Sequence, residues 1–234
     1  MDKRAKILKQ KRRCEKSTQR KNEERALIAA FEKRCKESGV RLPKSREEIL
    51  RAYREKESEV IRLSILTSSI ATLVALHRLW GFGKTRLYRM AIEFTMRIGN
   101  VGQNERKVSQ MSDDLILDAG LDCESEWQGV MIDKPKGNPY EVKAMLESIP
   151  HTIPVIMYAV HYSLGFKRRR MKRLHTYTKD LIIKTLKENS LNILIDELFN
   201  IGLMVNMTGQ YKAKGKGIAK EHDKFMRITG GYKK

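Results

Sequence analysis

Two clusters of Arg and Lys side chains are the groups in this sequence that are best suited to bind an anionic ligand. One lies in the stretch GFGKTRLYRM (81–90) and the other in GFKRRRMKRL (165–174). Arg and Lys near the start of a helix contact phosphates and the edges of guanine bases, so both clusters predict contacts with nucleic acid. The predicted binding residues are Lys84, Thr85, Arg86, Tyr88 and Arg89, followed by Lys167, Arg168, Arg169, Arg170, Lys172 and Arg173.

The alternative interpretation of both clusters is a basic helix face that is merely solvated. The second cluster argues against it, because a run of positive charges at a helix start opposes the helix macrodipole. An anion bound nearby would relieve that opposition. Binding of an anionic ligand is therefore the favoured interpretation.

A different chemistry is indicated by Asp133, Glu141 and Lys143, which follow the Asp…Glu-x-Lys order of the metal and base set in many DNA nucleases. There the carboxylates hold Mg²⁺ while the Lys positions the attacking water. Such a set needs strands to present it, and the sequence predicts only a short strand at 130–132. We keep a Mg-dependent nuclease as a remote alternative and expect a non-enzymatic protein without metal or cofactor.

Two other motifs do not predict a ligand site. Gly83–Thr85 resembles the end of a phosphate-binding loop, but Arg78 stands where that motif requires its first Gly. His77 and His161 lack a second ligand at helical i+4 spacing, so they are predicted to pack or to cap a helix.

The charge distribution supports a polyanionic partner. The formal net charge is +20. Residues 1–63 hold 21 basic and 11 acidic side chains, residues 64–148 hold 10 and 11, and residues 149–234 hold 17 and 6. A positive field concentrated at both ends of the chain attracts nucleic acid by counterion release.

The two basic clusters belong to an internal repeat with an offset of 84 residues. Residues 75–90 and 159–174 align without gaps, and DDLILDAGL (113–121) aligns with DELFNIGL (196–203) with one gap. Six of the 16 positions in the first alignment are identical, including the pairs His77/His161, Gly81/Gly165 and Phe82/Phe166. The pattern indicates duplication of a three-helix unit.

Each copy resembles the helix-turn-helix motif of DNA-binding regulators, in which two helices meet at a short turn that contains Gly. The resemblance implies that Gly81 and Gly165 are turn residues with positive φ, and that Phe82 and Phe166 turn inward. The motif also prefers a small residue four positions before the Gly, where this chain has His77 and His161.

Helices are predicted to position both clusters. Ser45–Glu48 has the form of a capping box that starts a long helix ending near residue 80. Further helices are expected at 84–98, 112–119, 153–164, 167–189 and 191–205. The fold class is therefore mostly α, with two tandem three-helix units. The expected organisation is a basic helical arm (1–58), a first unit (59–121), a Gly/Pro-rich connection (122–150), a second unit (151–207) and a basic flexible tail (208–234).

Several protein classes are excluded by the sequence. The longest uncharged stretch around the apolar peak, 63–77, is shorter than the ~18–20 residues of a membrane-spanning helix. The charged beginning has no apolar region of a secretory signal. Three cysteines without CxxC spacing predict neither a disulfide framework nor a zinc site. We expect a cytoplasmic protein.

The ALHxxxGFGKxRL stretch also resembles sequences in uncharacterised proteins of bacteriophages and mobile elements of Gram-positive bacteria. The leading prediction is a non-enzymatic protein that binds nucleic acid. Duplex DNA is the favoured ligand and RNA is the alternative one. The predicted role is regulatory or architectural in the bacterial host cell, in association with the nucleoid. The alternative is a phage-type inhibitor that binds a host ribonucleoprotein, nuclease or polymerase complex.

Overall fold

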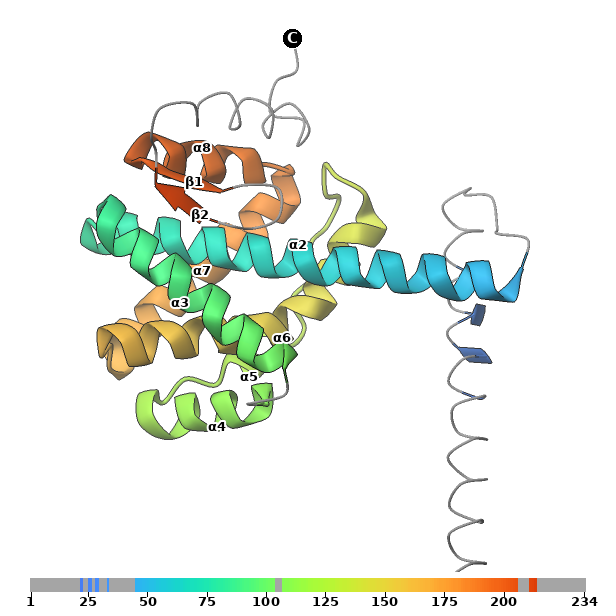
Figure 1. Ribbon diagram of the computed structural model, residues 1–234, viewed down its shortest axis with the longest axis horizontal. Coiled ribbons are helices and arrows are strands. Elements are labelled where there is room, and N and C mark those ends of the chain that lie inside the picture. Colours follow the sequence, from blue (N-terminus) through green and yellow to red (C-terminus); the bar gives the residue numbers. More distant parts are fainter. Residues whose placement is uncertain are drawn as a thin grey trace, which may run out of the picture. The chain divides into compact units, whose positions relative to one another are not determined.

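A computed structural model of the protein describes residues 45–103, 107–205 and 211–213, and in addition the single helical residues 22, 25, 26, 28, 29 and 33. Within these residues the chain is mostly helical, which confirms that the fold is mostly α (Figure 1). The elements are α2 (Arg46–Trp80), α3 (Lys84–Gly102), α4 (Val108–Ala119), α5 (Cys123–Trp127), α6 (Pro139–Leu164), α7 (Arg168–Glu188), α8 (Leu191–Ile201), β1 (Leu203–Val205) and β2 (Tyr211–Ala213).

The chain divides into two compact units, Met1–Glu59 and Val60–Lys234, and the division falls inside α2. In the first unit the structure describes the beginning of α2 and the six single helical residues. Most of the predicted arm (1–58) lies outside the described residues. The second unit contains all of the predicted binding residues.

The capping box predicted at the start of α2 is confirmed. The backbone N–H of Glu48 donates to Ser45 Oγ (3.2 Å), and the backbone N–H of Ser45 donates to Glu48 Oε2 (3.4 Å). These bonds satisfy two N–H groups that have no partner within the first helical turn.

The C-terminal half of α2 lies in the hydrophobic core of the second unit, where Ile70, Leu73 and Leu76 are fully buried. By length and composition alone, the segment Arg54–Trp80 is able to cross a membrane, contrary to the expectation from its uncharged stretch. However, 67% of its most apolar window is buried inside the protein. A buried helix at the centre of a core meets the same criterion.

Helix α6 is the element on which much of the second unit packs. α3, α4 and α5 pack against it, and α7 contacts both α6 and α4. On α3, the guanidinium of Arg97 lies 5.6 Å from the ring centroid of Tyr158 on α6. Elements that precede α6 in the sequence therefore form a large part of its cover.

The predicted connection (122–150) is largely helical in the structure. α5 occupies its beginning, α6 starts at Pro139, and the predicted strand at 130–132 is absent. Proline favours the first helical position, because the N–H that it lacks would have no partner there. The side chain of Asn138 completes this start by accepting the backbone N–H of Tyr140 (3.0 Å).

The last described elements also differ from the prediction. The helix expected at 191–205 ends at Ile201, where Gly202 adopts a left-handed conformation (φ 95°). β1 follows and pairs antiparallel with β2, with Met204 opposite Lys212. β2 belongs to the predicted flexible tail (208–234), the rest of which lies outside the described residues.

Candidate functional site

A turn of the same geometry precedes each basic cluster. Gly81 (φ 66°) and Gly165 (φ 63°) are left-handed, a conformation that a Cβ atom disfavours. The next residues, Phe82 and Phe166, point into the core and are 7% and 5% exposed. The positive φ of both glycines and the inward direction of both phenylalanines were predicted and are confirmed.

The histidine four residues before each Gly forms a hydrogen bond across the turn. The Nδ1–H of His77 donates to the backbone carbonyl of Phe82 (2.9 Å), and His161 makes the same bond to Phe166 (2.6 Å). A small residue at this position could not reach that carbonyl. The departure from the helix-turn-helix pattern thus has a structural reason, because both histidines close the turn that follows their helix.

Residues related by the 84-residue offset meet each other between α2 and α6. The rings of Phe82 and Phe166 pack edge to face, with centroids 6.4 Å apart. The buried hydroxyl groups of Ser68 and Thr152 lie 3.4 Å apart. In a two-fold arrangement equivalent residues meet only at the axis. Both contacts have the form that a pseudo-two-fold relation between α2 and α6 would give, and we call the line through them the pseudo-two-fold axis.

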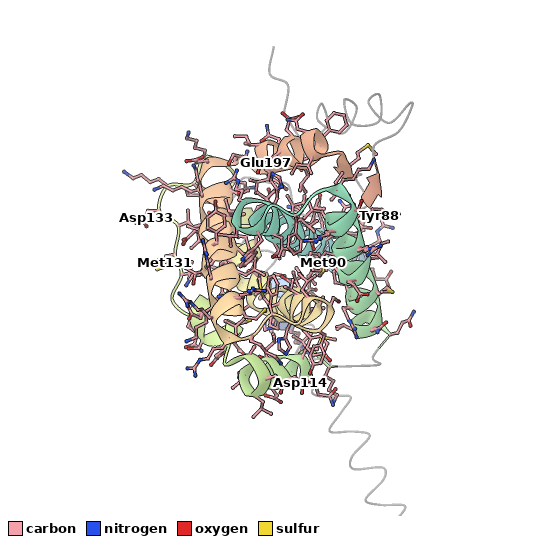
Figure 2. The ribbon with its side chains drawn as sticks, turned by 90° about the vertical axis from the view of Figure 1, so that its left-hand side faces the viewer. Tyr88, Met90, Asp114, Met131, Asp133 and Glu197 are labelled. Carbon is pink, nitrogen blue, oxygen red and sulfur yellow. The ribbon has the colours of Figure 1, made fainter. Side chains whose placement is uncertain are left out.

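The basic clusters lie on both sides of this axis, on the exposed faces of the first two turns of α3 and α7. Figure 2 shows the corresponding face of the molecule, with α3 and α7 on opposite sides of α2 and α6. Neither α3 nor α7 has a side-chain cap or an acidic residue in its first turn. The positive ends of both helix dipoles thus add to the charge of the basic side chains.

Two arginines lie close to the axis. Arg86 stacks over the ring of Phe82, 5.4 Å from its centroid, and Arg170 stacks in the same way over Phe166, at 5.5 Å. Lys84 is set apart because it has a partner inside the protein. Within the described part of the chain, no carboxylate forms an ion pair with any of the other exposed cations of the two clusters. These cations are Arg86, Arg89, Lys167, Arg168, Arg169, Arg170, Lys172 and Arg173.

Three further predicted binding residues, besides Arg86 and Arg170, have contacts within the fold. Arg168 lies against Gly120, the left-handed residue that ends α4, where the carbonyl end of a helix attracts a cation. Tyr88 is half-buried and packs against the core. Lys84 has a partner inside the protein. Thr85 and the other basic residues of the two clusters are exposed.

Two polar contacts between distant helices were not predicted. The guanidinium of Arg78 on α2 donates to both carboxylate oxygens of Glu197 on α8, with Nε 2.9 Å from Oε1. At the position 84 residues later, the hydroxyl of Tyr162 on α6 donates to Asp118 on α4 (2.9 Å). This hydrogen bond raises the pKa of Tyr162 to about 12. The equivalence of positions 78 and 162 in the repeat was the one sequence signal that could have linked these contacts.

The residues of the nuclease alternative are not presented by strands. Asp133 lies in the loop before α6 (Figure 2). Glu141 and Lys143 are exposed on α6 itself. Residues two apart on a helix do not face each other, and Glu141 accepts a hydrogen bond from Asn138 Nδ2 (3.3 Å). Among the described residues no group of three His, Cys, Asp or Glu side chains is placed to hold a metal ion.

Replacing Gly81 or Gly165 with Ala is expected to destabilise the protein by about 1–2 kcal/mol, because a Cβ atom disfavours the left-handed conformation. An ideal Cβ at either position meets no atom within 4 Å, so the backbone alone causes the loss. Gly99→Ala is the matched control. Gly99 lies inside α3, its Cβ also meets nothing within 4 Å, and Ala stabilises a helix interior by about 1 kcal/mol.

Thermal melting distinguishes the two effects, which should differ in sign. A Gly81→Ala or Gly165→Ala variant that melts like the wild type but no longer binds its ligand would show that the glycine backbone contacts the ligand instead.

The arrangement thus offers a face with two uncapped helix starts and exposed cations on both sides of a pseudo-two-fold axis. No protein-family model, curated protein or solved structure matches the chain.

Proposed function

We propose that the protein is a non-enzymatic nucleic-acid-binding protein of phage or mobile-element origin, with duplex DNA as its ligand and a regulatory or architectural role in the bacterial cytoplasm. One observation carries the proposal. Exposed arginines in the first turns of α3 and α7 have no carboxylate partner among the described residues, namely Arg86 on α3 and Arg168, Arg169 and Arg170 on α7. The same turns have backbone N–H groups that no side chain caps. Such turns bind phosphate oxygens through both charge and N–H groups.

The proposal includes a duplicated three-helix unit, α2–α4 and α6–α8, with a helix-turn-helix-like turn in each copy. The paired conformations of Gly81 and Gly165 and the paired histidine hydrogen bonds support it. So do the left-handed glycines that end the third helices, Gly120 and Gly202. In this interpretation the duplication places two cationic turns on one face.

Direct binding measurements test the proposed function. Fluorescence anisotropy with duplex DNA, single-stranded DNA and RNA at about 100 mM salt should give the tightest dissociation constant for the duplex. Non-specific DNA binding falls in the range of about 10⁻⁴–10⁻⁶ M at physiological salt, so a tighter value would indicate sequence or shape preference.

The alternative, an inhibitor of a host ribonucleoprotein, nuclease or polymerase complex, predicts another outcome. Naked duplex would then bind more weakly than about 10⁻⁴ M, and the protein would co-purify with the host complex. That combination would contradict the proposed function.

A further inference from the structure

The two arginines near the pseudo-two-fold axis limit how a duplex can lie on this face. Arg86 and Arg170 occupy equivalent positions 84 residues apart, and each stacks on the Phe of its own turn. The two Phe rings meet each other at the axis. The two guanidinium groups are therefore held around one point of the surface by contacts within the core.

Three distances give the upper limit of their separation. The guanidinium carbons lie 5.4 and 5.5 Å from their ring centroids, and the centroids are 6.4 Å apart, so the two carbons are separated by at most about 17 Å. Two-fold helix-turn-helix dimers place their half-sites about 34 Å apart, one helical turn of DNA. The grooves themselves are about 6 Å and 12 Å wide. The separation of Arg86 and Arg170 is compatible with one groove and too small for two successive turns.

The symmetry of the site matches that of the ligand. The two strands of a duplex are related by local two-fold axes, and a protein whose own two-fold coincides with one of them presents equivalent groups to both strands. Arg86 and Arg170 carry equal charge on equivalent supports, and no described carboxylate pairs with either of them.

We propose that the protein binds duplex DNA across its pseudo-two-fold axis, with Arg86 and Arg170 contacting the phosphates of the two strands on either side of a single groove. This inference rests on the proposed function and defines its ligand further. One helical turn of duplex is then a complete binding site, and the two arginines contribute equally.

The test compares duplex lengths and single variants. Dissociation constants per site are measured by anisotropy for hairpin duplexes of about 12 and about 24 base pairs, roughly one and two helical turns. The shorter duplex should bind within about 3-fold of the longer one. Arg86→Ala and Arg170→Ala should weaken binding to the same extent. Each should make the negative slope of log K against log salt shallower by about 1. Arg62→Ala, which removes one exposed charge from α2 outside the two clusters, is the control and should leave affinity within about 2-fold.

The outcomes separate this inference from the proposed function. Strong binding to 24 base pairs that is lost at 12 would overturn the single-groove arrangement while leaving duplex binding intact. Unequal effects of Arg86→Ala and Arg170→Ala would do the same. Failure to bind either duplex would reject the proposed function and this inference together.

Discussion

Raising the salt concentration from about 50 to about 200 mM is expected to weaken duplex binding by about 10³–10⁵-fold. A protein that makes 6–10 phosphate contacts releases a similar number of counterions, and log K then falls with log salt at a slope of about −0.9 per contact. The exposed cations around α3 and α7 are numerous enough to supply these contacts. Anisotropy titrations at four or five salt concentrations give the slope directly.

A triple variant assigns this slope to the proposed face. Arg169→Ala, Lys172→Ala and Arg173→Ala together should reduce the slope by about 3 units. Arg168 and Arg170 are retained because they contact Gly120 and the Phe166 ring. The control variant loses the same charge elsewhere, at Arg62, Lys143 and Lys187, and should keep most of the slope. A salt-independent affinity, or equal losses in the two triple variants, would contradict binding through this face.

The second large effect concerns the pH dependence of stability. His175 on α7 is buried, and desolvation lowers its pKa from 6.5 to about 4, against the opposing influence of Glu126 and with a further contribution from Lys179. The unfolded chain takes up a proton near pH 6.5, whereas the folded protein takes it up only near pH 4. Stability from this residue is therefore complete above pH 6.5 and is lost as pH falls toward 4, by about 3 kcal/mol.

Urea unfolding at several pH values measures this loss. In His175→Leu, or in His175→Gln with a polar side chain, the destabilisation between pH 6.5 and 4 should be smaller than in the wild type by about 3 kcal/mol. His151→Leu is the control, since His151 is exposed on α6. Identical pH profiles for the wild type and both His175 variants would show that the folded protein admits a proton at this site without cost.

Features fixed by a few neighbouring residues were predictable from the sequence. The capping box at Ser45 and the left-handed Gly81 and Gly165 depend on local backbone geometry. The start of α6 was missed because Pro139 favours a first helical position as strongly as it disfavours an interior one. The first three turns of α6, from Pro139 to Ile149, are stabilised by burial of Val142, Met145 and Ile149 against distant helices. No pattern within 139–150 reports that burial.

The candidate site was predictable as a set of charges but not as a surface. The repeat indicated which residues are equivalent, and it gave no measure of the distance between Phe82 and Phe166. That contact depends on the packing of α2 against α6 and sets how close Arg86 lies to Arg170. Likewise, the contact of Arg168 with Gly120 joins residues of different helices and has no sequence signature.

The contacts of α2 with α8 and of α4 with α6 have a consequence for how the chain folds during translation. When α4 has left the ribosome, Asp118 still lacks Tyr162, and α3 and α4 still lack the helix against which they pack. Glu197, the partner of Arg78, is synthesised 119 residues after it. Long-range contacts of this kind delay folding until most of the chain is available. The apolar residues of α2, α3 and α4 therefore stay accessible to chaperones until the ribosome has completed the second half of the protein.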